Sequence, residues 1–237
     1  MSKVELKVDW ATHEAAKYAV LKWHYSKIMP RNKLVKIGVW ENGVFVGVVI
    51  FGPGASDALG KQHGLEPFEV CELVRIALSS HSSTVTRIVS LCFNFLKKHC
   101  PRIRLVISFA DPSQGHHGGI YQAGNWIYTG KTQESDEYTI HGKKMHGRAV
   151  RKTLEKYNIP GKNTLERARI FYKDINIEVG KGISKHRYLM PLDKKMRKQI
   201  LPLAQPYPKR SKQAMDGTTV TAKGQNLSDR SKQEKAS

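Results

Sequence analysis

The sequence has little of what marks an exported or membrane protein. No apolar run is long enough to span a bilayer, and no charged-then-apolar leader opens the chain. Its three cysteines, Cys71, Cys92 and Cys100, are an odd number without C-x-x-C spacing, and each lies in an apolar segment. This pattern argues against a disulfide scaffold or a cysteine metal site. It predicts core thiols in a soluble protein of the cytoplasm.

Acidic residues are also scarce, with 20 Asp and Glu against 40 Lys and Arg. Residues 1–142 carry 16 basic and 12 acidic side chains, whereas residues 143–237 carry 24 and 8. Because a basic surface releases counterions when it neutralises phosphates, the second part predicts a polyanion partner. A basic tail that serves only solubility or general RNA binding is the alternative. The first part alone does not indicate nucleic acid.

The first half of the chain reads as alternating strands and helices. Residues 4–8 alternate as in a strand, and Thr12 can cap a helix that ends in W-H-Y-S-K. Asn42 and Gly43 supply the positive φ angles of a tight turn, so residues 34–51 predict a hairpin. A further strand is expected at residues 70–78.

A helix followed by a buried strand forms the centre of the predicted fold. Residues 84–99 have the apolar spacing of an amphipathic helix, with Ser82 or Ser83 as its cap. The apolar run 105–109 predicts a strand parallel to 70–78, because strand–helix–strand units make right-handed crossovers. Further strands are expected near 137–141 and 185–192, with a short helix at 194–203.

These elements predict an α/β fold in which helices flank a mixed, twisted sheet. We expect a main domain at residues 1–142 and a basic extension at 143–205 that adds a last strand and contacts to a polyanion. Few apolar residues follow Pro206, so residues 206–237 predict a flexible tail.

Polar side chains gather where the strand 105–109 ends, which is where open α/β sheets place ligands. Ser108, Asp111, His116 and His117 lie there, and we expect the helix end at His24 and Tyr25 to face the same cleft. Each residue also has an ordinary structural interpretation. Ser108 can be a plain strand hydroxyl, Asp111 can start a turn, and the histidines can lie in an exposed loop.

Arg75 interrupts an apolar strand and therefore needs a partner. Strand alternation places Glu72 on the opposite face. Arg75 is thus expected either to pair with a carboxylate such as Asp111 or to meet an anionic ligand.

Two resemblances add to this interpretation. The element order and the segment G-I-Y-Q-A-G-N-W-I-Y-T-G resemble the GCN5-related N-acetyltransferase (GNAT) fold, in which such segments build an acyl-CoA cleft. Five motifs together resemble the Mom DNA-modification proteins of Mu-like bacteriophages over residues 3–130 and 185–210. These motifs are W-H-Y-S-K, C-E-L-V-R, S-F-A-D-P, H-H-G-G-I-Y-Q-A-G-N-W-I-Y-T-G and K-H-R-Y-L-M-P-L.

The resemblance implies an enzyme that converts the exocyclic amine of adenine in double-stranded phage DNA to a carbamoylmethylated form and protects it from host restriction. It also implies iron, and a donor of the carbon unit that is acyl-CoA or another molecule. Residues 79–84 depart from the GNAT phosphate loop because they contain no glycine. Two alternatives remain open: an acyl-CoA-dependent acetyltransferase of a protein or small amine, and a DNA-binding protein without catalysis. Oligomeric state is left open.

The candidate residues fall into four groups. The catalytic candidates are His24, Tyr25, Arg75, Ser108, Asp111 and Tyr121. The candidate iron ligands are His24, Tyr25, Asp111, His116 and His117. The candidate donor-binding residues are Ser82, Ser83 and Thr84. The candidate phosphate contacts to DNA are Lys143, Lys144, Arg148, Arg151, Lys152, Lys185, His186 and Arg187.

Overall fold

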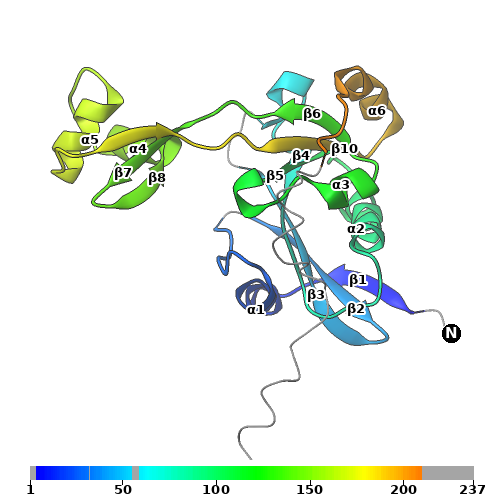
Figure 1. Cartoon of the computed structure of the whole chain (residues 1–237). Coiled ribbons are helices and arrows are strands. Elements are labelled where there is room, and N and C mark those ends of the chain that lie inside the picture. The colour runs from blue at the N-terminus through cyan, green and yellow to red at the C-terminus, as the bar shows by residue number, and fades with distance from the viewer. Residues whose placement is uncertain (1–3, 32, 55–58, 210–237) are drawn as a thin grey trace, which may run out of the picture.

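The structure of the protein is a computed structural model that describes residues 4–31, 33–54 and 59–209. In these ranges a seven-stranded sheet has the order β1-β2-β3-β4-β5-β10-β6, and a three-stranded sheet has the order β8-β7-β9 (Figure 1). The strands of the large sheet are β1 (Leu6–Trp10), β2 (Val35–Glu41), β3 (Val44–Gly52), β4 (Val70–Leu78), β5 (Leu105–Ala110), β6 (Ile127–Lys131) and β10 (His186–Pro191). The helices are α1 (His13–Trp23), α2 (Val85–His99), α3 (Gly119–Ala123), α4 (Gly147–Lys156), α5 (Thr164–Tyr172) and α6 (Lys194–Ile200). This mixed sheet flanked by helices confirms the predicted fold class.

Local sequence signals set the amino-terminal elements as predicted. The Thr12 hydroxyl accepts a hydrogen bond from the Ala15 amide at 3.1 Å and so caps α1. Asn42 and Gly43 have φ angles of 49° and 81°, and they close the hairpin between β2 and β3. The first strand lies two residues later than predicted at both ends, because Asp9 and Trp10 also pair with β2.

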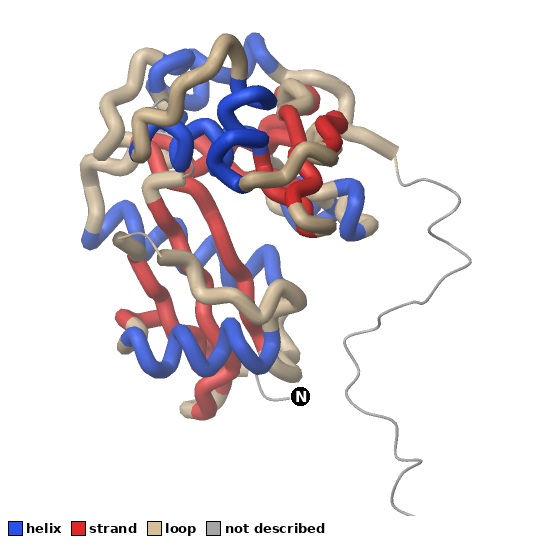
Figure 2. Tube along the Cα trace, turned by 90° about the vertical axis from the view of Figure 1, so that its left-hand side faces the viewer, coloured by secondary structure: helices blue, strands red, loops and turns tan. Residues whose placement is uncertain are grey.

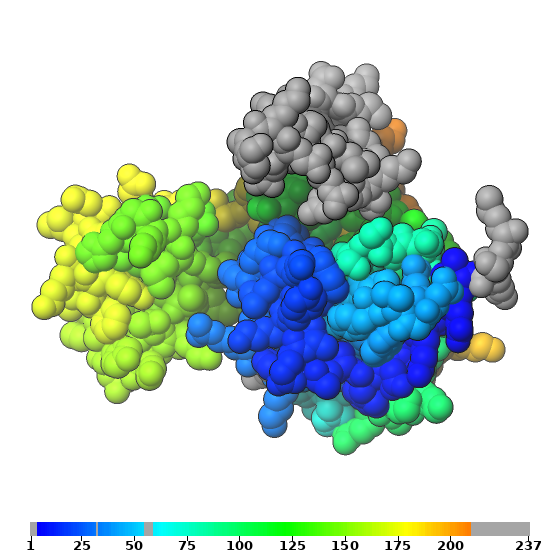
Figure 3. All heavy atoms as spheres, turned by 90° about the horizontal axis from the view of Figure 1, so that it is seen from below, coloured from blue at the N-terminus to red at the C-terminus, as the bar shows by residue number. Residues whose placement is uncertain are grey.

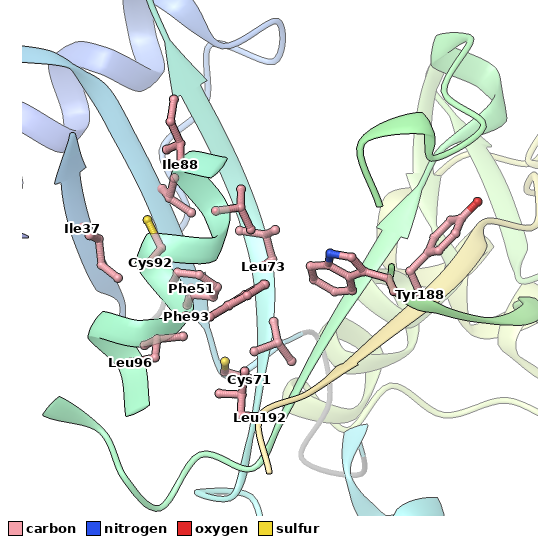
Figure 4. Packing of buried hydrophobic residues seen from close by; sticks show 14 of the residues in the cluster. Ile37, Phe51, Cys71, Leu73, Ile88, Cys92, Phe93, Leu96, Tyr188 and Leu192 are labelled. Atoms are coloured by element: carbon pink, nitrogen blue, oxygen red, sulfur yellow. The ribbon is translucent and has the colours of Figure 1, made fainter. Parts of the chain in front are cut away.

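The large sheet carries a helix layer on each face. One face packs against α2, where the buried core includes Phe51, Leu73 and Phe93 (Figure 4). The other face packs against α1, which lies across the strands in Figure 2, through Ala16, Ala19 and Val20. Because both faces are covered, the ligand-accessible positions lie at the ends of the strands.

The parallel pairing of β4 with β5 is confirmed, but it is short. Only Val70, Cys71 and Glu72 pair with β5, although β4 continues to Leu78. A register shift between Ile50 and Phe51 in the β3–β4 pairing marks a bulge around Val74. The bulge bends β4, so the two strands part after their first residues and open a gap in the sheet.

Residues between β6 and β10 form the second, smaller sheet. Its strands are β7 (Asp136–Ile140), β8 (Lys143–His146) and β9 (Glu178–Lys181), and α4 and α5 cover it with a core of its own. We call residues 136–181 the inserted module. It stands beside the main body on the side where α1 lies (Figures 1 and 3). The boundary expected at residue 142 falls inside the β7–β8 hairpin of this module.

The start of the expected tail packs on the main body. The Tyr207 hydroxyl donates to the Trp126 carbonyl oxygen at 2.6 Å, and the Gln122 side chain donates to the Pro208 carbonyl oxygen at 3.2 Å. Residues 210–237 lie outside the described residues. Among the helices that are described, none combines the length and apolar character needed to cross a membrane.

Candidate active site

The candidate active site lies where β4 and β5 part. Beyond their last paired residues, the Ser108 hydroxyl lies 3.1 Å from the Leu73 carbonyl oxygen and 2.7 Å from the Tyr121 hydroxyl. A carbonyl oxygen can only accept, and Ser108 has a single hydroxyl proton. Ser108 therefore donates to Leu73 across the gap, and Tyr121 donates to Ser108. This leaves the Tyr121 oxygen able to accept a hydrogen bond from a ligand.

Tyr121 is held rigidly by aromatic neighbours. Its ring centroid lies 5.0 Å from that of Trp126 and 5.0 Å from that of Tyr188. Burial raises the pKa of Tyr121, and the charge of Glu72 adds to this effect. The phenol is therefore protonated at neutral pH and serves as a hydrogen-bonding group rather than as a phenolate base.

His24 ends α1 and is 7% exposed. Its Nδ1 accepts the Ser26 amide hydrogen at 3.1 Å and lies 2.8 Å from the Ser26 hydroxyl. Because a backbone amide can only donate, Nδ1 carries no proton, and the neutral ring carries its proton on Nε2. Burial first, and then the charge of Arg75, lower the pKa of His24 from 6.5 to about 4. His24 is thus a neutral hydrogen-bond donor at neutral pH.

Tyr25 and His116 connect the end of α1 to the loop after β5. The Tyr25 ring lies 4.3 Å from the His24 ring and 5.6 Å from the His116 ring, as measured between centroids. Tyr25 is 61% exposed, so one face of its ring is open to solvent. The expected meeting of the α1 end with the histidine loop therefore occurs, and an exposed aromatic ring lies at its centre.

Asp111 directly follows β5, at the corner where the chain enters the histidine loop, and its carboxylate is engaged in structural contacts. Its carboxylate accepts hydrogen bonds from the Ser113 amide at 3.0 Å and the Ser113 hydroxyl at 2.6 Å, and it lies 3.0 Å from the Lys185 Nζ. Burial acts to raise the pKa of Asp111, but these partners outweigh it and the pKa is lowered. Asp111 is therefore an ionised residue that positions the loop rather than a proton acceptor.

His117 is half-buried, and its backbone rests on residues that the sequence did not reveal. The Tyr188 hydroxyl donates to the His117 carbonyl oxygen at 2.6 Å, and the Gln122 amide donates to the same oxygen at 3.2 Å. Gly118 has a φ angle of 86°, and a Cβ there would overlap the Tyr188 ring. Tyr188 is thus the support on which the loop lies. The only signal for it was its place in K-H-R-Y-L-M-P-L.

Arg75 lies close enough to His24 for its charge to lower the His24 pKa. Its Nη1 donates to the Val74 carbonyl oxygen at 2.6 Å. Within the described residues its Nε is buried without a hydrogen-bond partner, and no ion pair joins it to Asp111, which pairs with Lys185 instead. The expected pairing with Asp111 is therefore wrong. The bulge also breaks the alternation that was expected to place Glu72 and Arg75 on opposite faces.

The five candidate iron ligands are not gathered into one set. Across the described ranges, no three His, Cys, Asp or Glu side chains are placed to hold a metal ion together. Metal binding through Nε2 of His24 would require a proton on Nδ1, where the Ser26 amide already donates. The residues present do not form a ready metal site, and iron binding stays a prediction.

The candidate donor-binding segment is also engaged. The Thr84 hydroxyl accepts from the Arg87 amide at 3.3 Å and caps α2, so the cap is Thr84 rather than Ser82 or Ser83. The amides of Ser82 and Ser83 donate to the carboxylate of Glu41. A groove of about 440 Å³ lies alongside, between α2 and α3, and its walls include Asn94, Tyr121 and Asn125.

The candidate DNA contacts differ in their exposure and in the partners they already have. Five are exposed on β8 and α4 of the inserted module: Lys143, Lys144, Arg148, Arg151 and Lys152. Among these, Lys144 pairs with Glu137 at 3.3 Å and Arg151 pairs with Asp136 at 3.7 Å. Lys185 is bound to Asp111, and Arg187 donates to the Thr129 hydroxyl at 2.9 Å. His186 is 8% exposed and lies 2.9 Å from the Tyr128 hydroxyl, which places it inside the sheet and away from the surface.

Two tryptophans beside site residues are engaged in packing. Trp126 is 2% exposed and packs against Phe93, and the half-buried Trp23 packs against Tyr18 and Phe45. Neither ring is as open to solvent as that of Tyr25, which is 61% exposed.

Known proteins resemble this chain in sequence. A model of the Mom protein family matches residues 5–209. The chain is 28% identical over 216 residues to the methylcarbamoylase mom of Escherichia phage Mu, covering 86% of this chain and 84% of that protein.

Two solved structures are also similar. The aminoglycoside N-acetyltransferase AAC(6')-Ib11 is 14% identical and has a TM-score of 0.38, covering 54% of this chain and 89% of its own. FeeM, an N-acyl amino acid synthase from uncultured soil microbes, is 11% identical and has a TM-score of 0.41, covering 83% and 94%.

The support of the histidine loop by Tyr188 predicts unequal effects at two glycines. Gly118→Ala should lower the free energy of unfolding by about 2 to 4 kcal/mol, since it adds an overlap with Tyr188 to the cost of a positive φ. Gly115→Ala is the matched control, because its φ is 69° but the space around it is open. It should cost about 1 kcal/mol. Equal losses in denaturant unfolding would contradict the role given to Tyr188.

The charge of Arg75 predicts a shift in the titration of His24. Arg75→Gln should raise the His24 pKa above about 4, and Lys27→Gln should raise it less, because the Lys27 charge contributes least. Since the folded pKa lies below 6.5, the unfolded chain takes up this proton first. Stability is therefore lost as the pH falls from 6.5 toward 4. NMR titration of the imidazole measures the pKa directly, and an unchanged value in Arg75→Gln would show that the Arg75 charge does not act on His24.

Proposed function

The chain belongs to the Mom protein family, and we propose that it modifies DNA. It transfers a small amide-bearing carbon unit, as a carbamoylmethyl group, to the exocyclic amine of adenine in double-stranded DNA and so protects phage DNA from host restriction. The relative in phage Mu is named a methylcarbamoylase, which points to the isomeric group, so the form of the unit is part of the proposal. The meeting of Tyr25, His24, His116 and Tyr121 at the gap between β4 and β5 carries the proposal.

An adenine inside a duplex hides its amine, so the base must be extruded before it reacts. The exposed ring of Tyr25 supplies a flat surface at the mouth of the site, on which the extruded base stacks. His24 lies behind Tyr25, with the two ring centroids 4.3 Å apart, and supports the Tyr25 ring on the face opposite the base. These two groups would select and orient a planar heterocycle.

The amine is then held by Tyr121. With its own proton directed to Ser108, the Tyr121 oxygen accepts one amine hydrogen and aims the nitrogen lone pair at the donor carbon. When the new nitrogen–carbon bond forms, the donor loses its leaving group and the amine loses one proton. We assign the uptake of this proton to the exposed imidazole of His116, since His24 is occupied at Nδ1 by Ser26.

The half-buried guanidinium of Arg75 would stabilise the negative charge that develops on the donor during transfer. Its charge acts on the neutral His24 imidazole, and its Nε has no hydrogen-bond partner among the described residues. A positive charge that is fixed in a partly buried place stabilises such charge more strongly than it would in water.

The inserted module supplies the contact to the DNA backbone. Its exposed basic residues stand on β8 and α4, beside the α1 side of the main body (Figure 3). The ion pair between Lys185 and Asp111 connects the return from this module to the corner of the site. Contacts of this kind would position the duplex rather than choose its sequence.

Nucleoside mass spectrometry of DNA from cells that express the protein tests this function. The wild type should yield a modified deoxyadenosine, and fragmentation separates the carbamoylmethyl from the methylcarbamoyl isomer of equal mass. Tyr121→Phe should reduce the yield about a hundredfold, because the amine loses its positioning partner. Tyr157→Phe removes an exposed tyrosine hydroxyl from the module and serves as the matched control. Unmodified DNA from the wild type would refute the proposal.

The DNA surface predicts a defined salt dependence. Replacing Lys143 and Lys152 by Gln should weaken DNA binding and lower the slope of log affinity against log salt by about 0.9 for each phosphate that is no longer neutralised. The control with equal charge, Lys7→Gln with Lys98→Gln, changes exposed lysines of the main body. Fluorescence anisotropy with a duplex at several salt concentrations gives both slopes. Equal slopes for the two double variants would exclude the module surface.

A further inference from the structure

The start of α2 is the place in this fold where a phosphate would ordinarily bind. The first amides of a helix have no partner inside the helix, and together with the helix dipole they attract phosphate groups. α2 has 15 residues, follows β4 after the loop at residues 79–84, and lies next to the groove between α2 and α3. A donor that carries a diphosphate, such as CoA, would need the free amides of the loop at residues 79–84.

In this chain a carboxylate of the protein already takes two of the loop amides, those of Ser82 and Ser83. Glu41 ends β2 and is 7% exposed. Its two oxygens accept hydrogen bonds from the Ser82 amide at 2.8 Å and from the Ser83 amide at 2.7 Å. Ser83 is itself 6% exposed, so its contact with Glu41 lies beneath the surface, while Ser82 is exposed. Each carboxylate oxygen of Glu41 thus accepts one hydrogen bond. The carboxylate takes the place that a phosphate would occupy on these two amides.

The protonation state of Glu41 fits this arrangement. Burial acts to raise the pKa of its carboxyl, but the hydrogen bonds from Ser82 and Ser83 outweigh burial and the pKa is lowered. Glu41 is therefore charged at neutral pH. An entering diphosphate would meet a like charge and would also leave this buried carboxylate without its two donors.

We infer that Glu41 excludes donors that hold a nucleoside diphosphate at α2, so the carbon unit comes from a compact donor without one. This inference rests on the proposed function and specifies the class of its donor. The groove of about 440 Å³ between α2 and α3 is large enough for a small molecule. Tyr121 forms part of its wall, so a compact donor there lies against the site that holds the amine.

Calorimetric titration of the wild-type protein with CoA, and separately with ADP as a plain diphosphate probe, tests the inference. We expect no saturable binding of either up to about millimolar concentration. Glu41→Ala frees two amides and removes the like charge, so it should bind ADP at least tenfold more tightly than the wild type. Glu155→Ala removes an exposed carboxylate on α4 and is the control for net charge.

Saturable binding of CoA to the wild type, with hydrogen-exchange protection at residues 79–84, would overturn the inference. So would a folded Glu41→Ala protein with no gain in ADP affinity. If Glu41→Ala does not fold, the wild-type titration still decides. Nucleoside analysis of DNA reports separately on the proposed function, because DNA modification without CoA binding supports both, whereas CoA binding with modified DNA overturns this inference alone.

Discussion

The parting of β4 and β5 is the constraint on which the site depends. The two strands share hydrogen bonds only at Val70, Cys71 and Glu72, because the bulge around Val74 bends β4 away. A gap in a sheet leaves backbone groups without ladder partners, and these must be satisfied in another way. Ser108 satisfies the Leu73 carbonyl oxygen and at the same time fixes Tyr121. The Ser108 hydroxyl therefore gives the Leu73 carbonyl oxygen a hydrogen-bond partner and also fixes the position of the Tyr121 hydroxyl.

The strand β10 makes this opening rigid. It returns from the inserted module, enters the sheet between β5 and β6, and places the buried Tyr188 under the histidine loop. The ion pair of Lys185 with Asp111 holds the residue before β10 against the end of β5. Because the module leaves after β6 and comes back as β10, the DNA surface and the active site share one support. A loop that is held at both ends in this way keeps its catalytic groups in the productive geometry.

Much of the fold followed from local chemistry that the sequence displays. Thr12, Asn42 and Gly43 set a cap and a turn through contacts within three residues, and apolar spacing marked β4, α2 and β5 in the right order. The sequence also predicted that the α1 end would meet the loop after β5, and Tyr25 with His116 confirms this meeting. It did not predict the bulge, since the extra residue in β4 depends on the register with β3.

What the sequence determined by itself was the order of the elements, the excess of positive charge after residue 142 and the residue types at the site. Tertiary structure alone decided their roles. It turned Asp111 toward Lys185, buried His186, and seated Glu41 on amides 41 and 42 residues away in the chain. The physical reason is the separation along the chain over which each contact acts. Backbone groups at caps and turns find partners a few residues away, whereas a buried charge needs partners that only the folded chain brings close to it.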